Sequence, residues 1–82
     1  MTDRFIIIGR SSCPFCTMAA DLLIAKGTQY IFLDYISEPD ALEEYKQFHE
    51  QDTVPIILRN NLESGLTSKI GGYSDLLEVV NV

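Results

Sequence analysis

The chain has 82 residues, of which 46% are hydrophobic and 22% charged, and this length and composition predict one globular domain over residues 1–82. The formal net charge at pH 7 is −6 and the few lysines and arginines are scattered, so we expect no nucleic-acid partner. Because no apolar run approaches the roughly 18 residues that span a bilayer, and residues 1–10 lack the pattern of a secretory signal, we expect no membrane partner and a cytoplasmic location.

The first half of the chain predicts a strand–helix–strand unit. The apolar run Arg4–Gly9 has the length and β-branched content of a strand buried on both faces. A short polar turn leads into a helix over residues 15–26, which has Pro14 in its first turn and ends at a glycine. The second strand is Gln29–Tyr35. A crossover of this length predicts that the two strands run parallel.

The second half predicts a helix, two strands joined by a polar turn, and a short final helix. Their expected ranges are Asp40–Glu50, Thr53–Leu58, Asn60–Gly65, Leu66–Ile70 and Asp75–Val80. The buried face of the first helix should include Leu42, Tyr45 and either Phe48 or His49, and Ser74 can cap the last helix. A short turn makes the last two strands antiparallel. The order β-α-β-α-β-β-α therefore predicts an α/β fold, with a mixed four-stranded sheet and helices on both faces.

The only two cysteines, Cys13 and Cys16, form a Cys-x-x-Cys motif at the start of the first helix. Such a pair can staple a loop, supply half of a metal site, or act as a redox couple, and proximity to a βαβ unit favours the redox couple. A zinc site needs two further ligands, so we expect no metal. The helix amino terminus and Arg10 should favour a thiolate at Cys13, which predicts Cys13 as the nucleophile and Cys16 as the resolving cysteine.

Three motifs resemble those of glutaredoxins and occur in the same order. CPFC, residues 13–16, is similar to the CPYC active site of the dithiol class, with phenylalanine in place of tyrosine. TVP, residues 53–55, is similar to the cis-proline loop, and GGYSDL, residues 71–76, is similar to the glutathione-binding turn. The chain therefore resembles a dithiol glutaredoxin over nearly its whole length. The resemblance implies the glutaredoxin variant of the thioredoxin fold, with a cis peptide bond before Pro55.

The resemblance also implies a glutathione-dependent thiol-disulfide oxidoreductase. Glutathione would be its co-substrate, and its targets would be glutathione mixed disulfides and disulfide-bonded or glutathionylated proteins, with ribonucleotide reductase as a family-level candidate. We expect the protein to act as a monomer. The residues that the resemblance assigns to glutathione binding are Arg10, Phe15, Thr53, Val54, Pro55, Gly72, Tyr73, Ser74 and Asp75.

Two departures from the family pattern leave alternatives open. The turn around Asn60–Thr67 is longer than expected, and Asp52 stands where the family commonly has a basic residue, so it would repel the glycine carboxylate of glutathione. One alternative is an electron donor recharged by thioredoxin reductase. Another alternative is a module that binds an iron–sulfur cluster between two chains and two glutathiones. Pro14 argues against it, because cluster-binding members of the family favour smaller, more flexible residues at this position.

Overall fold

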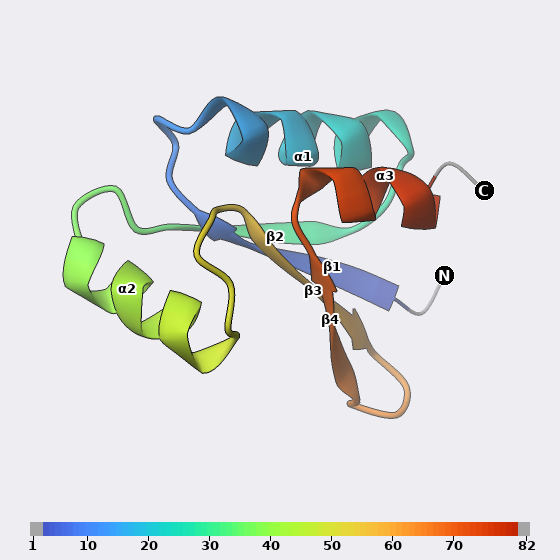
Figure 1. Ribbon diagram of the computed structural model, residues 1–82. Coiled ribbons are helices and arrows are strands. Elements are labelled where there is room, and N and C mark those ends of the chain that lie inside the picture. The colour runs from blue at the N-terminus through green and yellow to red at the C-terminus, as the bar shows by residue number, and fades with distance from the viewer. Residues whose placement is uncertain (1–2, 81–82) are drawn as a thin grey trace.

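The computed structural model of the protein describes residues 3–80 (Figure 1). Four strands and three helices follow one another in the predicted order. Their bounds are β1 Asp3–Gly9, α1 Pro14–Ala25, β2 Tyr30–Asp34, α2 Pro39–Phe48, β3 Ile56–Asn61, β4 Thr67–Gly71 and α3 Tyr73–Val80. No helix in this part of the chain combines the length and apolar character needed to cross a membrane.

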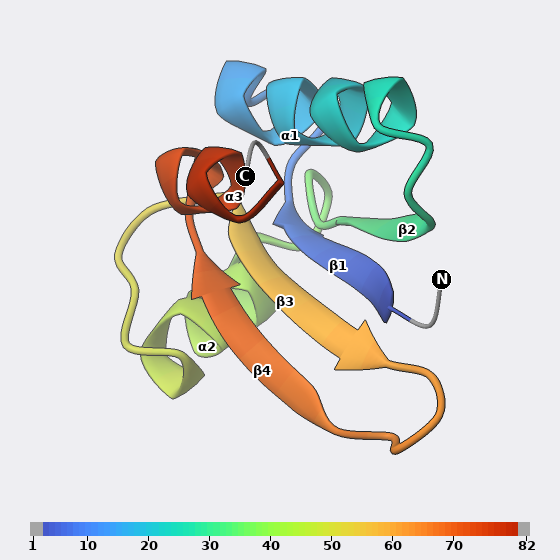
Figure 2. The ribbon, with the colours of Figure 1, turned by 90° about the vertical axis from the view of Figure 1, so that its right-hand side faces the viewer.

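The strands form one mixed sheet in the spatial order β2-β1-β3-β4. Strand β1 pairs with β2 in parallel and with β3 in antiparallel orientation, and β3 pairs with β4 in antiparallel orientation. Helices α1 and α3 lie side by side over one face of the sheet, and α2 covers the other (Figures 1 and 2). The predicted fold class is therefore confirmed.

The central strand β1 is buried on both faces because its side chains alternate between two apolar clusters. Phe5 and Ile7 point to the side of α1 and α3, whereas Ile8 points to the side of α2. The first cluster contains the buried residues Phe5, Ile7, Ala19, Leu23, Ile57 and Leu76. The second contains Ile8, Leu42 and Ile56. This explains why the β1 sequence is a continuous apolar run rather than an alternating one.

Helix α1 begins and ends where its sequence predicts. Pro14 occupies the first turn, where its missing N–H leaves no hydrogen bond unmade. At the other end Gly27 has a φ of +66°, and the N–H groups of Gly27 and Thr28 donate to the carbonyls of Ile24 and Leu23. This glycine-terminated C-cap satisfies the last carbonyls of the helix. Residues 10–13 connect the carboxyl end of β1 to the start of α1.

The third strand differs from its predicted bounds at both ends. Residues 53–55 form a loop, so β3 begins at Ile56 and not at Thr53. The strand then continues to Asn61, into the segment predicted as a turn, because Asn60 and Asn61 pair with β1. The reversal follows Asn61, whose side-chain oxygen accepts the N–H groups of the next turn, at Glu63 and Ser64. The hairpin between β3 and β4 is therefore long because β3 itself is extended, and not because an irregular loop is longer.

The side-chain predictions for α2 and α3 were confirmed only in part. For α2 the prediction named either Phe48 or His49; Phe48 is 81% exposed, whereas His49 is half-buried and lies just after the helix. Ser74 lies inside α3 and does not cap it. The carboxylate of Asp75 instead accepts the Gly72 N–H at 2.9 Å, which serves the same purpose of satisfying a free donor at the helix start.

Candidate active site

Cys13 lies at the amino end of α1, in the loop that follows β1. It is the N-cap residue, with an extended backbone (φ −93°, ψ 118°), and its N–H donates to the Arg10 carbonyl at 3.1 Å. The side chain of Asp34, at the end of β2, accepts the N–H groups of Ser11 at 3.0 Å and Ile36 at 3.1 Å. A hydrogen bond from the Ser11 side chain, together with those from the two N–H groups, lowers the pKa of Asp34, so its carboxylate stays ionised and holds the loop that carries Cys13.

The surroundings of Cys13 favour its thiolate form. Partial burial acts to raise the pKa of the Cys13 thiol, but hydrogen bonds from the Cys16 thiol and from the N–H groups of Cys16 and Phe15 lower it, as does the charge of Arg10. The net result is a pKa below the ordinary value of a cysteine. The direction is the one predicted from the helix amino terminus and Arg10.

Cys16 lies one turn further along α1 and is fully buried. Burial and the neighbouring Cys13 raise the pKa of the Cys16 thiol to about 12, although a backbone hydrogen bond at Arg10 and the charge of Arg10 act in the opposite direction. The sulfur packs against Gly9, where any Cβ would collide with it. Both cysteines are free in this structure. The pair is therefore asymmetric, with one thiol prone to ionise and a second held neutral beside it.

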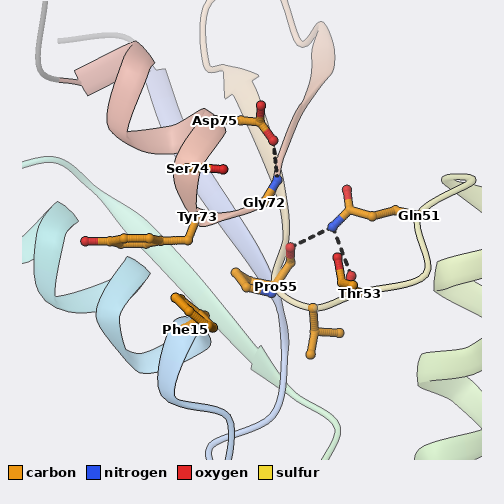
Figure 3. A pocket seen from close by; sticks show the side chains of 9 residues that line it. Phe15, Gln51, Thr53, Pro55, Gly72, Tyr73, Ser74 and Asp75 are labelled. Carbon is orange, nitrogen blue, oxygen red and sulfur yellow. Dashed lines mark hydrogen bonds between the residues drawn. The ribbon is translucent and has the colours of Figure 1, made fainter.

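A cleft of about 670 Å³ lies next to the loop that Cys13 contacts, and Figure 3 shows the residues that line it. It is formed by the start of α1, the loop before β3 and the start of α3. The lining residues are Phe15, Gln51, Thr53, Val54, Pro55, Gly72, Tyr73, Ser74 and Asp75. The Cys13 sulfur lies 3.9 Å from the Val54 carbonyl oxygen, so the sulfur lies against the loop that forms one wall.

The floor and one side of the cleft are apolar. Pro55 is buried, and the Val54–Pro55 peptide bond is cis, as the resemblance predicted. A Cβ built on Gly9 would lie 3.8 Å from the Cα of Pro55 and would collide with the Cys16 sulfur. Pro55 therefore lies close to the cysteine pair. The rings of Phe15 and Tyr73 stand together with centroids 6.1 Å apart and form the aromatic side (Figure 3).

The opposite end of the cleft is the start of α3. Gly71 has a φ of +122°, a conformation that side chains other than glycine rarely adopt, and a Cβ there would collide with the Asp75 carboxylate. One oxygen of that carboxylate accepts the Gly72 N–H, as Figure 3 shows. A carboxylate has more than one acceptor site, so the capping contact leaves Asp75 able to accept a second donor from a ligand.

The predicted binding residues line this cleft with the exception of Arg10. Arg10 is exposed and acts on Cys13 through its charge, and it is not part of the cleft wall. Gln51 lines the cleft but was missed, because a glutamine two residues before TVP belongs to no motif of its own. His49 lies at a separate surface hollow with Phe48, and burial, followed by the charge of Lys69, lowers its pKa. The roles of these residues stay predictions.

Metal ligands do not cluster in the part of the chain that the structure describes. Across residues 3–80, no three side chains of His, Cys, Asp or Glu come close enough together to hold an ion.

Comparison with known proteins identifies relatives of this chain. The family model described as Glutaredoxin matches residues 5–61. Glutaredoxin-1 of Ectromelia virus (strain Moscow) is 38% identical over 87 residues, which cover 98% of this chain and 74% of the viral protein. The glutaredoxin of Neisseria meningitidis is 37% identical over 67 residues, covering 78% of this chain and 69% of its own length.

Solved structures agree with these sequence matches. The structure of reduced Escherichia coli glutaredoxin has a TM-score of 0.68 and 32% identity, and the match covers 95% of this chain and 93% of that one. A buckwheat glutaredoxin–glutathione complex has a TM-score of 0.72 at 23% identity, covering 93% of this chain and 66% of that one. At this identity the buckwheat protein supports the fold alone.

Proposed function

Because the chain belongs to the glutaredoxin family and is therefore a thiol-disulfide oxidoreductase with two nearby cysteines, we propose that glutathione is the thiol it works with. The observation that carries the proposal is the position of the Cys13 sulfur, 3.9 Å from the Val54 carbonyl at the wall of a cleft that ends at the α3 amino terminus. A sulfur at this position can receive a tripeptide that extends from the Val54 loop to α3.

In the proposed monothiol cycle, the Cys13 thiolate attacks the glutathionyl sulfur of a mixed disulfide. The Cys13–glutathione disulfide forms, the original disulfide breaks, and the leaving thiolate takes a proton from solvent. A second glutathione thiolate then attacks the glutathionyl sulfur, which produces oxidised glutathione and restores the Cys13 thiolate. The lowered pKa of Cys13 serves both halves, because it provides an attacking thiolate and later a good leaving group.

In the proposed dithiol cycle, Cys13 first forms a mixed disulfide with a target protein and Cys16 then attacks the Cys13 sulfur. The target leaves as a thiolate and the Cys13–Cys16 disulfide remains, to be reduced by two glutathiones. Burial is the main reason that the pKa of Cys16 is raised, and the neighbouring Cys13 thiolate raises it further. Once Cys13 is in a mixed disulfide its charge is gone, so Cys16 loses its proton more easily at the step that needs it.

The cleft offers partners for two parts of glutathione, the cysteinyl peptide and the γ-glutamyl group. The Val54 peptide group can pair with the cysteinyl peptide as an added strand would. The amino terminus of α3 suits the γ-glutamyl carboxylate, and Asp75 suits its ammonium. Arg10 and Asp52 lie outside the cleft wall, so the glycine carboxylate meets no lining cation. Glutathionylated proteins, with ribonucleotide reductase among the candidates, would enter with their glutathionyl group in the same position.

The test is turnover of a small glutathione mixed disulfide with either of two recharging systems. One contains glutathione and glutathione reductase, and the other contains thioredoxin reductase. We expect turnover only with glutathione, and none for Cys13→Ser. Cys16→Ser should keep this activity and lose reduction of protein disulfides. Turnover supported only by thioredoxin reductase would overturn the glutathione assignment, and joint loss of both activities in Cys16→Ser would overturn the division of roles.

A further inference from the structure

Gln51 makes two hydrogen bonds to the loop that faces Cys13. Its side-chain nitrogen donates to the Thr53 carbonyl at 2.9 Å and to the Pro55 carbonyl at 2.8 Å, as Figure 3 shows. A primary amide has two hydrogens, so both of its donors are used. The two bonded carbonyls stand on either side of Val54 in sequence. The half-buried Gln51 side chain therefore fixes the backbone on both sides of this residue.

These two hydrogen bonds of Gln51, which together form the Gln51 bridge, leave the N–H and C=O groups of Val54 available to pair with a ligand. Among residues 3–80, the Val54 N–H makes no backbone hydrogen bond, and the Val54 carbonyl has only the long contact with the Cys13 sulfur, at 3.9 Å. An extended peptide pairs with another strand through the N–H and C=O of the same residue. A substrate that pairs with Val54 would therefore have its own sulfur held close to the sulfur of Cys13.

We propose that Gln51 is a positioning residue. It holds the Val54 peptide group in the position that aligns the disulfide of a bound peptide with the Cys13 sulfur. The inference rests on the proposed function only in taking a disulfide within a peptide as the substrate. Gln51 acts on the backbone and makes no contact with either sulfur in this structure. Its loss should therefore impair the placement of the substrate without changing the reactivity of the Cys13 thiol.

Thr53 is exposed, so water can replace Gln51 at its carbonyl, and the loop can persist without the bridge but with less defined geometry. Gln51→Met keeps the length and shape of the side chain and removes both donors. Gln51→Asn keeps the amide but is one methylene shorter, so it cannot reach both carbonyls. Gln29→Met is the matched control, because Gln29 is exposed and lies just before β2, outside the cleft.

The experiment compares two kinds of disulfide in single-turnover reduction. The peptide substrates are oxidised glutathione and the disulfide of N-acetylcysteinylglycine amide, which lacks a γ-glutamyl group. The substrate without a peptide is 2-hydroxyethyl disulfide. We expect both Gln51 variants to lose on the order of tenfold in the second-order rate constant of single-turnover reduction on the peptide substrates, mainly through weaker substrate binding. Their rates on 2-hydroxyethyl disulfide, and the pH profile of Cys13 alkylation by iodoacetamide, should match those of the wild type and of Gln29→Met.

Equal losses on all substrates would overturn the inference and reduce Gln51 to a general structural role. Unchanged kinetics in both variants would overturn it as well. The two peptide substrates separate this result from the proposed function. A wild type that prefers the N-acetylated peptide over glutathione would contradict the glutathione assignment, whereas a selective loss in the Gln51 variants on that peptide would still support the positioning role.

Discussion

Replacing Cys16 by alanine should make the Cys13 thiolate less stable, although Cys13 itself is unchanged. The Cys16 thiol is one of the donors that lower the pKa of Cys13, against the opposing effect of partial burial. Alanine removes this donor and leaves the backbone N–H groups of residues 15 and 16 and the Arg10 charge in place. The pKa of Cys13 should therefore rise towards its ordinary value.

The size of the effect follows from the kind of hydrogen bond that is lost. A hydrogen bond to a charged acceptor contributes about 1.5–3 kcal/mol, and a thiol is a weak donor, so the lower end applies. A loss of about 1.4 kcal/mol corresponds to a roughly tenfold change in an equilibrium constant. The ratio of thiolate to thiol at Cys13 should therefore fall about tenfold at a pH where the wild type is partly ionised.

The assay is the rate of Cys13 alkylation by iodoacetamide as a function of pH, checked by thiolate absorbance in the ultraviolet. Cys16→Ser is the matched control, because its hydroxyl can donate in place of the thiol. We expect the alanine profile to move to higher pH and the serine profile to stay close to the wild type. Identical profiles for alanine and serine would refute the reasoning, since the hydrogen bond would then not be the cause.

Three other perturbations test different parts of the structure. Gly71→Ala should lower the free energy of unfolding by about 2–4 kcal/mol in urea denaturation, because it combines a strained positive φ with a collision at Asp75, and Gly72→Ala, where a Cβ meets only ordinary contacts, should cost much less. Burial raises the pKa of Cys16 from 9.0 to about 12, so the neutral thiol stabilises the fold fully below pH 9.0. This contribution should disappear from the reduced protein as the pH rises from 9.0 to about 12, which thermal melts will show as a falling Tm. An equal fall in the Tm of Cys16→Ser over this range would contradict that account. Asp52→Lys should lower the KM for a glutathione mixed disulfide roughly two- to fivefold, more at low salt, as for an exposed charge pair; a salt-independent KM would argue against it.

Local sequence signals predicted the order of elements and most of the cleft. The β-branched run of β1, Pro14 and Gly27 around α1, and the Cys-x-x-Cys spacing each act over a few residues, so each can be interpreted in isolation. The motifs around Pro55 and Gly72 pointed to the same cleft because the resemblance supplied the long-range arrangement. Periodicity alone could not have placed two segments so distant in the chain next to Cys13.

Other features depended on contacts between distant segments. The extension of β3 to Asn61 follows from pairing with β1, which overrides the turn preference of two asparagines. Phe48, the last residue of α2, is exposed although its spacing fits the buried face, and the Gln51 bridge depends on how the chain returns to β3. Hydrophobic pattern, capping residues and cysteine spacing are local properties, so the sequence by itself determined the elements, the family and the reactive pair. Strand pairing, burial and side-chain reach exist only after the segments pack together, so the tertiary structure alone decided how the cleft wall is held and where β3 begins and ends.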